Sequence, residues 1–237
     1  MLDTLVRLLL SPILVAQALG VRRKAQSLPE ARGPRKSTAG AGPSLKLRII
    51  GDSSAAGVGV NHQNDALAGQ LSHNLHPHFR LMWTLDATSG ATTKSTLTRL
   101  ESASPISTNI VIIALGVNDV TRLVPARMWV KQQHSLFARI NQLYQPDHIY
   151  LSGMPPFEHF PLLPNPLRWA LARHAKKLEK RLVRSLYGQT QITYVPFSIA
   201  PSGELIASDG FHPSYALYTL WAKEMANRII SDWPKSS

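Results

Sequence analysis

Cysteine is absent from this chain of 237 residues. Its absence excludes a disulfide scaffold, a cysteine zinc site and a cysteine nucleophile. No apolar run reaches the roughly 18–20 residues that a membrane-spanning helix requires. Charged residues make up only 17% of the chain and hydrophobic residues 44%, which is typical of a globular protein. The length suits one sizeable domain better than two.

The net charge of +12 is concentrated in two segments. Residues 1–48 carry nine lysines and arginines against Asp3 and Glu30, and residues 168–187 carry seven against Glu179. Such basic segments suit an anionic membrane surface or nucleic acid. Because the chain has no nucleic-acid-binding motif, we expect no nucleic-acid partner. The second segment has helical periodicity, and we expect its charges to face water, with a membrane contact as the alternative.

Residues 1–25 form an apolar and basic N-terminal segment. Its apolar stretch covers residues 8–19, and a basic cluster follows at residues 22–24. A membrane-surface helix, a signal peptide with a cleavage site at residues 16–18 and a helix packed on the domain are all compatible with this pattern. We favour the membrane-surface helix, which Pro12 would kink or interrupt. Its apolar residues at helical spacing are Leu2, Leu5, Leu9 and Ile13.

Residues 26–44 are rich in proline, glycine and serine and predict a linker. The globular domain is expected over residues 45–237. Within it, apolar runs and helical periodicity alternate. Strands are expected at residues 45–50, 79–85, 109–115, 148–152 and 191–196, and helices at residues 64–74, 92–103, 125–144, 166–187 and 214–231. This alternation predicts an α/β fold, a three-layer α/β/α sandwich around a doubly wound parallel sheet of about five strands.

Four short motifs lie where the carboxyl ends of these strands should meet. Gly51-Asp52-Ser53-Ser54 follows the first strand, Thr88-Ser89-Gly90-Ala91 the second and Gly116-Val117-Asn118-Asp119 the third. Asp209-Gly210-Phe211-His212 precedes the last helix. Functional groups gather at this edge of an open parallel sheet, so we expect the four motifs to converge.

The residue types in these motifs suit nucleophilic catalysis. Ser53 is a nucleophile that needs a base, His212 can supply it, and Asp209 can orient the imidazole. A tetrahedral intermediate also needs hydrogen-bond donors for its oxyanion. The backbone N–H groups of Ser53 and Gly90 and the side-chain amide of Asn118 are the candidates. No metal or other cofactor is required.

Together the four motifs resemble the sequence blocks of the SGNH/GDSL hydrolase family, over roughly residues 45–233. The first motif reads GDSS where the family has GDSL. The resemblance implies a flavodoxin-like fold and a serine esterase or lipase. It also implies that Ser53 is the nucleophile, that His212 and Asp209 complete the catalytic set, and that Gly90 and Asn118 serve the oxyanion hole.

Each motif taken alone has a simpler explanation. Ser53 could cap a helix, and Asn118 could belong to an ordinary turn. The apolar loop after the fourth strand is expected to line an acyl pocket, to form a lid or only to cover the core. Its candidate pocket residues are Met154, Phe157 and Phe160, with Leu162 and Leu163 beside them.

The leading hypothesis is a serine hydrolase that cleaves a carboxylic ester through an acyl-enzyme, as esterases, lipases and lysophospholipases do. A lipidic or acyl ester is favoured over a sugar acetate. The alternatives are a carbohydrate O-deacetylase and a catalytically idle, membrane-associated binding protein. The charge pattern favours a cytoplasmic location with peripheral association to an anionic membrane, and export is the alternative. The sequence leaves the oligomeric state open.

Overall fold

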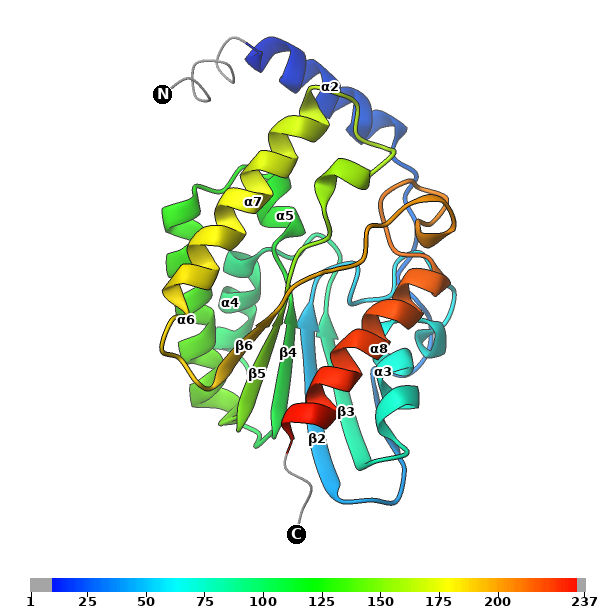
Figure 1. Cartoon of the computed structure of the whole chain (residues 1–237), viewed down its shortest axis with the longest axis vertical. Helices are drawn as coiled ribbons and strands as arrows, with labels where there is room; N and C mark the ends of the chain where they lie inside the picture. Colours follow the sequence, from blue (N-terminus) through cyan, green and yellow to red (C-terminus); the bar gives the residue numbers. More distant parts are fainter. Residues whose placement is uncertain (1–9, 234–237) are drawn as a thin grey trace.

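A six-stranded sheet in the order β1-β3-β2-β4-β5-β6 forms the centre of the fold (Figure 1). The structure is a computed structural model that describes residues 10–233. Strands β2 to β6 pair in parallel, and β1 pairs antiparallel with β3. The strands are β1 (Lys36–Ala39), β2 (Ser44–Gly51), β3 (Arg80–Ala87), β4 (Ile110–Ala114), β5 (His148–Ser152) and β6 (Ile192–Val195). The predicted five-stranded parallel sheet is confirmed, with one antiparallel edge strand added.

Helices cover both faces of this sheet, which confirms the three-layer sandwich (Figure 1). Helices α3 and α8 pack together on one face, and α4, α6 and α7 pack in sequence on the other. The helices are α2 (Ser11–Lys24), α3 (Leu67–Leu75), α4 (Thr93–Glu101), α5 (Val117–Thr121), α6 (Ala126–Tyr144), α7 (Leu167–Ser185) and α8 (Tyr215–Asp232). Short 3-10 turns lie at Gln63–Asp65, Phe157–His159 and Gly203–Leu205.

Strand β4 shows why the sheet needs both helical layers. All five of its side chains are buried. Ile110 and Ile112 pack in the cluster beneath α3 and α8, whereas Val111 and Ile113 pack in the cluster beneath α6 and α7. Successive side chains of a strand point to opposite faces, so an uninterrupted apolar strand must be covered on both sides.

Helix α2 lies outside the sheet layers, beside the start of α7 (Figure 1). Pro12 does not interrupt it but stands in its first turn, where a missing N–H and a fixed φ are tolerated. Leu2, Leu5 and Leu9 of the predicted membrane-surface helix lie outside the described residues. Within residues 10–233, no helix has both the length and the hydropathy to cross a membrane.

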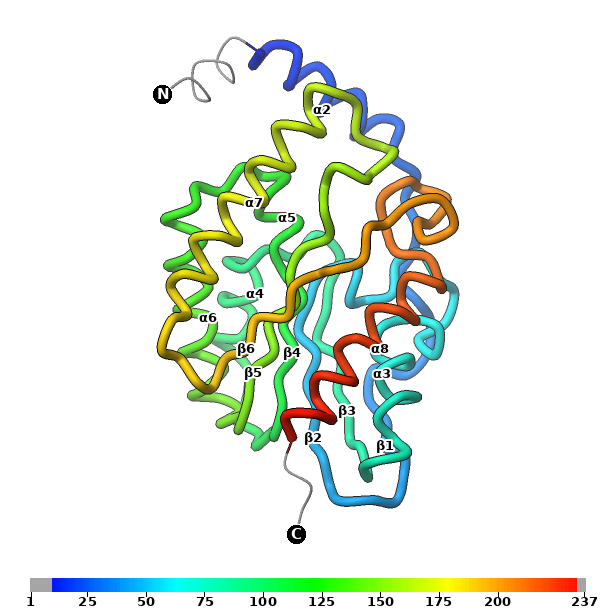
Figure 2. Tube along the Cα trace, viewed as in Figure 1, coloured from blue at the N-terminus to red at the C-terminus, as the bar shows by residue number. Residues whose placement is uncertain are grey.

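The segment between α2 and β2 is more ordered than the predicted linker over residues 26–44. It runs along the side of the domain from α2 to the outer edge of the sheet (Figure 2). Lys36–Ala39 form β1 there, although three of the four side chains are exposed. The strand therefore depends on backbone pairing with β3, and side-chain patterning gives no signal for it.

Candidate active site

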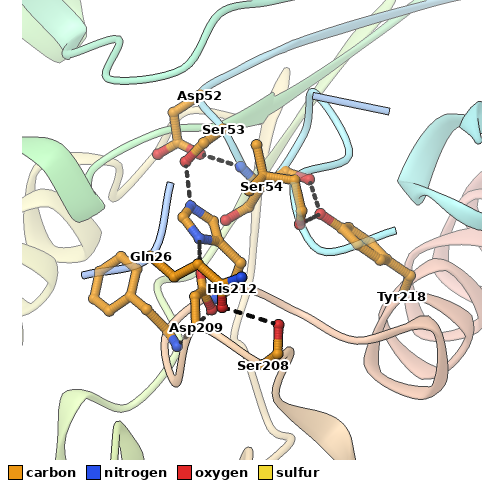
Figure 3. Close-up of polar contacts among 10 residues, drawn as sticks. Gln26, Asp52, Ser53, Ser54, Ser208, Asp209, His212 and Tyr218 are labelled. Atoms are coloured by element: carbon orange, nitrogen blue, oxygen red, sulfur yellow. Dashed lines mark hydrogen bonds and ion pairs between the residues drawn. The ribbon is translucent and has the colours of Figure 1, made fainter. Parts of the chain in front are cut away.

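Three side chains from two distant parts of the chain form a continuous hydrogen-bonded row (Figure 3). Ser53 follows β2, and Asp209 and His212 lie in the loop that precedes α8. His212 Nε2 lies 2.8 Å from Ser53 Oγ, and His212 Nδ1 lies 2.5 Å from Asp209 Oδ2. The structure thus brings together the three residues that the sequence proposed as nucleophile, base and orienting carboxylate.

The loop before α8 fixes the Asp209 carboxylate and the His212 ring relative to each other. Asp209 Oδ1 accepts hydrogen bonds from the backbone N–H groups of Phe211 at 2.9 Å and of His212 at 3.0 Å. Gly210, between them, has a φ of +73°, which a residue with a Cβ rarely adopts. Burial alone raises the pKa of Asp209, but the hydrogen bonds from His212 and Phe211 outweigh it and hold that pKa below its usual value. The carboxylate is therefore charged beside the imidazole.

Ser53 sits in a series of tight turns after β2, and no helix begins there, so it does not cap one. The Tyr218 hydroxyl lies 2.7 Å from the carbonyl oxygen of Ser54 and 2.8 Å from that of Val58, so its single proton is shared between them and ties these turns to α8 (Figure 3). Gly51 begins the turns, and a Cβ there would come within 2.3 Å of the Ala55 side chain. The loop therefore packs too closely for any residue but glycine at that position.

The buried carboxylate of Asp52 stabilises the loop that carries Ser53. Asp52 is 2% exposed, and its Oδ1 accepts the backbone N–H of Ser54 at 3.0 Å. Burial raises the pKa of Asp52 to about 6, because the charged form loses its hydration there. Its other oxygen, Oδ2, faces the Asn118 amide at 3.4 Å. Asp52 thus connects the Ser53 loop to the motif that follows β4.

Asn118 also reaches the turn that carries Gly90. The Nδ2 atom of Asn118, at the start of α5, donates to the carbonyl oxygen of Ala91 at 3.1 Å. Gly90 has a φ of +76°, and a Cβ on it would meet no atom within 4 Å. Among residues 10–233, no acceptor takes a hydrogen bond from the backbone N–H of Ser53 or of Gly90. Two free N–H donors and one amide therefore lie in the motifs proposed for the oxyanion hole.

Asp119, the neighbour of Asn118, binds the start of α4 from within the core. Its Oδ2 accepts hydrogen bonds from the Thr93 N–H at 3.0 Å and hydroxyl at 2.9 Å, and Asp119 itself is fully buried. Burial raises its pKa, although the Thr93 bonds oppose that effect. The Trp129 indole in turn donates to the Thr93 hydroxyl at 3.0 Å. This network joins the start of α4 to α5 and α6.

A mostly apolar cavity of about 40 Å³ lies beside Asp52 and Ser54, under the loop before α8. Met154 and Phe160, two of the predicted pocket residues, line it. Phe157 does not line this cavity; it is fully buried, and its ring centroid lies 5.4 Å from that of Phe160. Further lining side chains that the sequence analysis did not single out are Phe197, Ile206, Phe211 and Trp221.

Phe211 joins the cavity wall to the histidine. Its ring centroid lies 4.7 Å from that of Phe160 and 5.4 Å from that of His212. Its position between Gly210 and His212 in the fourth motif was the one available signal for this role.

No group of three histidine, aspartate or glutamate side chains in the described residues is arranged to hold a metal ion.

Comparison with known proteins places this geometry in a family. The model of the GDSL-like lipase/acylhydrolase family matches residues 49–220. A search of curated proteins finds no match. Among solved structures, the acetylxylan esterase Axe2 from Geobacillus stearothermophilus is 18% identical with a TM-score of 0.57, covering 83% of this chain and 99% of its own. Esterase EstA from Pseudoalteromonas sp. is 20% identical with a TM-score of 0.59, and the match covers 78% of this chain and 96% of EstA. TesA is also 20% identical, with a TM-score of 0.60, and the match covers 77% of this chain and 97% of TesA.

Proposed function

The chain belongs to the GDSL-like lipase/acylhydrolase family and is a carboxylic ester hydrolase, and from that premise we propose that it works through an acyl-enzyme formed on Ser53. The observation that carries the proposal is the row Ser53–His212–Asp209, with distances of 2.8 and 2.5 Å. A serine hydroxyl becomes an effective nucleophile when a base lies within hydrogen-bond reach and a third group orients that base.

The proposed reaction has two halves. Ser53 Oγ attacks the ester carbonyl carbon while His212 Nε2 takes its proton, and Asp209 stabilises the imidazolium that forms. The tetrahedral intermediate collapses when His212 returns the proton to the leaving alcohol, and the acyl group stays on Ser53. Water then attacks this acyl-enzyme with His212 again as the base, and the acid is released.

The oxyanion of each intermediate is held by three donors in this proposal. They are the backbone N–H groups of Ser53 and Gly90, which have no acceptor among residues 10–233, and the Asn118 amide. Asn118 already donates to Ala91 at 3.1 Å and, over a longer 3.4 Å, to Asp52. The oxyanion replaces the longer and weaker of these two bonds. Each donor of this kind contributes about 3–4 kcal/mol to transition-state stabilisation.

The apolar cavity beside Asp52 suggests which acyl groups the site accepts. Its lining is largely aromatic and aliphatic, which suits an apolar acyl chain. Its volume of about 40 Å³ gives room for roughly three water-sized groups. We therefore propose an ester whose acyl chain has a few carbons, from acetyl to about butanoyl.

A series of p-nitrophenyl esters from acetate to palmitate tests this function. We expect kcat/KM to peak at or below the butanoate and to fall steeply towards the palmitate. Met154→Trp, which fills the cavity, should shift the optimum to acetate. A palmitate optimum would contradict the proposed acyl size. An absence of turnover on every ester would support an idle binding protein and would overturn the proposed function.

A carbohydrate O-deacetylase is the second candidate, since the small cavity admits an acetyl group and Axe2 is named as an acetylxylan esterase. The two candidates differ in the alcohol they require. Acetylated xylooligosaccharides and p-nitrophenyl acetate should be compared at equal concentration. A kcat/KM at least roughly 100-fold higher on the sugar acetate would favour the deacetylase, because a sugar subsite contributes binding in the transition state.

We also propose that α2 binds an anionic membrane surface and brings the site to lipid-borne esters. Its inner face is anchored by Gln17, whose Oε1 accepts the Leu167 N–H at 3.0 Å and whose Nε2 donates to the Asn165 carbonyl at 2.7 Å. Its opposite face is apolar: Val15 and Leu19, one helical turn apart, are 58% and 52% exposed. The last turn adds Arg22, Arg23 and Lys24, and α2 contains no acidic residue. Apolar contact area next to basic residues matches an anionic lipid interface.

Sedimentation with vesicles tests the membrane proposal. The wild type should bind phosphatidylcholine vesicles containing phosphatidylglycerol and bind pure phosphatidylcholine at least roughly tenfold more weakly, because each basic residue near the surface contributes about 1 kcal/mol. The double variant Val15→Glu, Leu19→Glu should lose this binding. Ile106→Glu is the matched control, since Ile106 is 55% exposed in the loop before β4. Equal binding of the double variant and the wild type would contradict the proposal, and dimerisation through α2 would be the alternative.

A further inference from the structure

Glu30, in the segment between α2 and β1, contacts the turn that carries Gly90. Its Oε1 accepts two hydrogen bonds from Ser89, one from the backbone N–H at 2.7 Å and one from the hydroxyl at 2.8 Å. Glu30 precedes residues 49–220, which match the family model, so the contact comes from outside that match. The matched segment thus receives part of its support from the chain that precedes it.

A second residue of the same segment completes the contact. Arg35 Nη2 pairs with Glu30 Oε2 at 2.5 Å, and Arg35 Nη1 donates to the carbonyl oxygen of Ala87 at 2.6 Å. Ala87 ends β3, and Ser89 follows two residues later. The Glu30–Arg35 pair therefore forms hydrogen bonds with the residues on both sides of Thr88, immediately before Gly90.

The Gly90 turn needs such support because glycine restrains its own backbone weakly. A Cβ at Gly90 would meet no atom within 4 Å, so little packs against the turn there. On its far side, Asn118 Nδ2 donates to the Ala91 carbonyl at 3.1 Å and Arg122 Nη2 to the Gly90 carbonyl at 3.1 Å. Glu30 restrains the other end of the turn through its two hydrogen bonds with Ser89, the residue before Gly90.

We propose that Glu30 is a positioning residue for the oxyanion hole: it holds Ser89 so that the Gly90 N–H points at the developing oxyanion. The inference rests on the proposed function of Gly90. An oxyanion donor acts only when it is already aimed at the intermediate, so a turn that moves by tenths of an ångström loses transition-state stabilisation while substrate binding changes little. Glu30 itself touches no substrate.

Glu30→Ala and Glu30→Gln separate this role from a merely structural one. Glu30→Ala should lower kcat on the best p-nitrophenyl ester roughly tenfold, less than the loss of a whole donor, with KM changed by less than about twofold. Glu30→Gln keeps an oxygen that can accept the Ser89 N–H, so it should retain most of the wild-type kcat. A rise in KM with kcat unchanged, or no change in either constant, would overturn the proposal.

Asp232→Ala is the matched control. Asp232, at the end of α8, also combines an arginine partner with a hydroxyl, since its Oδ2 accepts from Arg228 at 2.7 Å and from Tyr150 at 3.3 Å. Its side chain is 29% exposed, against 31% for Glu30. Both alanine variants should lower the melting temperature by a few degrees, but only Glu30→Ala should lower kcat. An equal effect of both variants on kcat would assign Glu30 a structural role.

Amide hydrogen exchange of residues 88–91 tests the contact independently of activity. Exchange of the Ser89 N–H should be at least several-fold faster in Glu30→Ala than in the wild type and unchanged in Asp232→Ala. Unchanged exchange would contradict the positioning role whatever the kinetics show. If the wild type hydrolysed no ester while exchange at Ser89 responded to Glu30, the proposed function would fail and the contact itself would stand.

Discussion

Asp209 binds His212 twice, through the ring and through the backbone. Its Oδ2 lies 2.5 Å from His212 Nδ1, and its Oδ1 accepts the His212 N–H at 3.0 Å. A single carboxylate thus sets both the position of the residue and the orientation of its imidazole. The three-residue separation in sequence makes this possible, because one short loop before α8 contains both partners.

Asp209→Asn separates the two bonds. Asparagine can keep the backbone contact through its oxygen, but its NH₂ group turned to the ring favours the wrong imidazole tautomer. We expect kcat to fall by about 10,000-fold, the loss that the wrong imidazole tautomer causes in a Ser-His-Asp triad, with the fold intact. Steady-state kinetics and circular dichroism would check this. Activity within about threefold of the wild type would mean that Asp209 does not orient His212 in catalysis.

Gly90→Ala tests the oxyanion turn, and the chain offers a matched glycine. Gly90 and Gly188 have φ values of +76° and +79°, and a Cβ on either meets nothing within 4 Å. Alanine in that conformation costs about 1–2 kcal/mol at both positions, so both variants should lose similar stability. Only Gly90→Ala should lose kcat/KM, by at least about tenfold, because relief of the strain moves its N–H. Equal kcat/KM values for both variants would mean that the Gly90 N–H does not bind the oxyanion.

Asp52 predicts a specific pH dependence of stability. Burial raises its pKa from 3.8 to about 6, so the folded state holds a proton that the unfolded state has already lost between these values. The stability contributed by Asp52 is therefore full below about pH 4, declines as the pH rises to about 6, and stays low above it. The decline is on the order of 3 kcal/mol.

Asp52→Asn removes this titration. Denaturant unfolding at intervals from pH 4 to pH 8 should show the variant gaining stability relative to the wild type as the pH rises through this range. The gain should level off above about pH 7. A stability difference that does not change with pH would mean that Asp52 is not buried with a raised pKa in the folded protein.

The sequence predicted the strongly patterned parts of the fold well. The apolar run around β4 required burial on both faces, and α6, α7 and α8 lie within two residues of their predicted ends. Strand β1 and the five-residue α5 were missed. Exposed side chains give β1 no alternation, and α5 is too short to show helical periodicity.

The site was predicted in part, for a similar physical reason. Parallel strands present their carboxyl ends at one edge, so the motifs that follow two such strands predict from the sequence alone that Ser53 and Asn118 lie near each other. Glu30 and Phe211 could not be assigned in the same way. The contact of Glu30 with Ser89 joins residues 59 positions apart and depends on the path of an irregular segment. Phe157 was expected in the pocket wall; it contacts Phe160 but does not line the cavity beside Asp52.

Covalent labelling of Ser53 by a fluorophosphonate, read by peptide mass spectrometry, tests the central claim most directly. The chain holds its own control, because Ser185 Oγ lies 2.9 Å from His134 Nε2 while its hydroxyl donates to the Leu182 carbonyl at 2.7 Å. We predict one adduct, on Ser53, which is lost in Ser53→Ala and kept in Ser185→Ala. An adduct that persists in Ser53→Ala, or ester hydrolysis that survives that substitution at more than about 1% of the wild-type rate, would contradict the account.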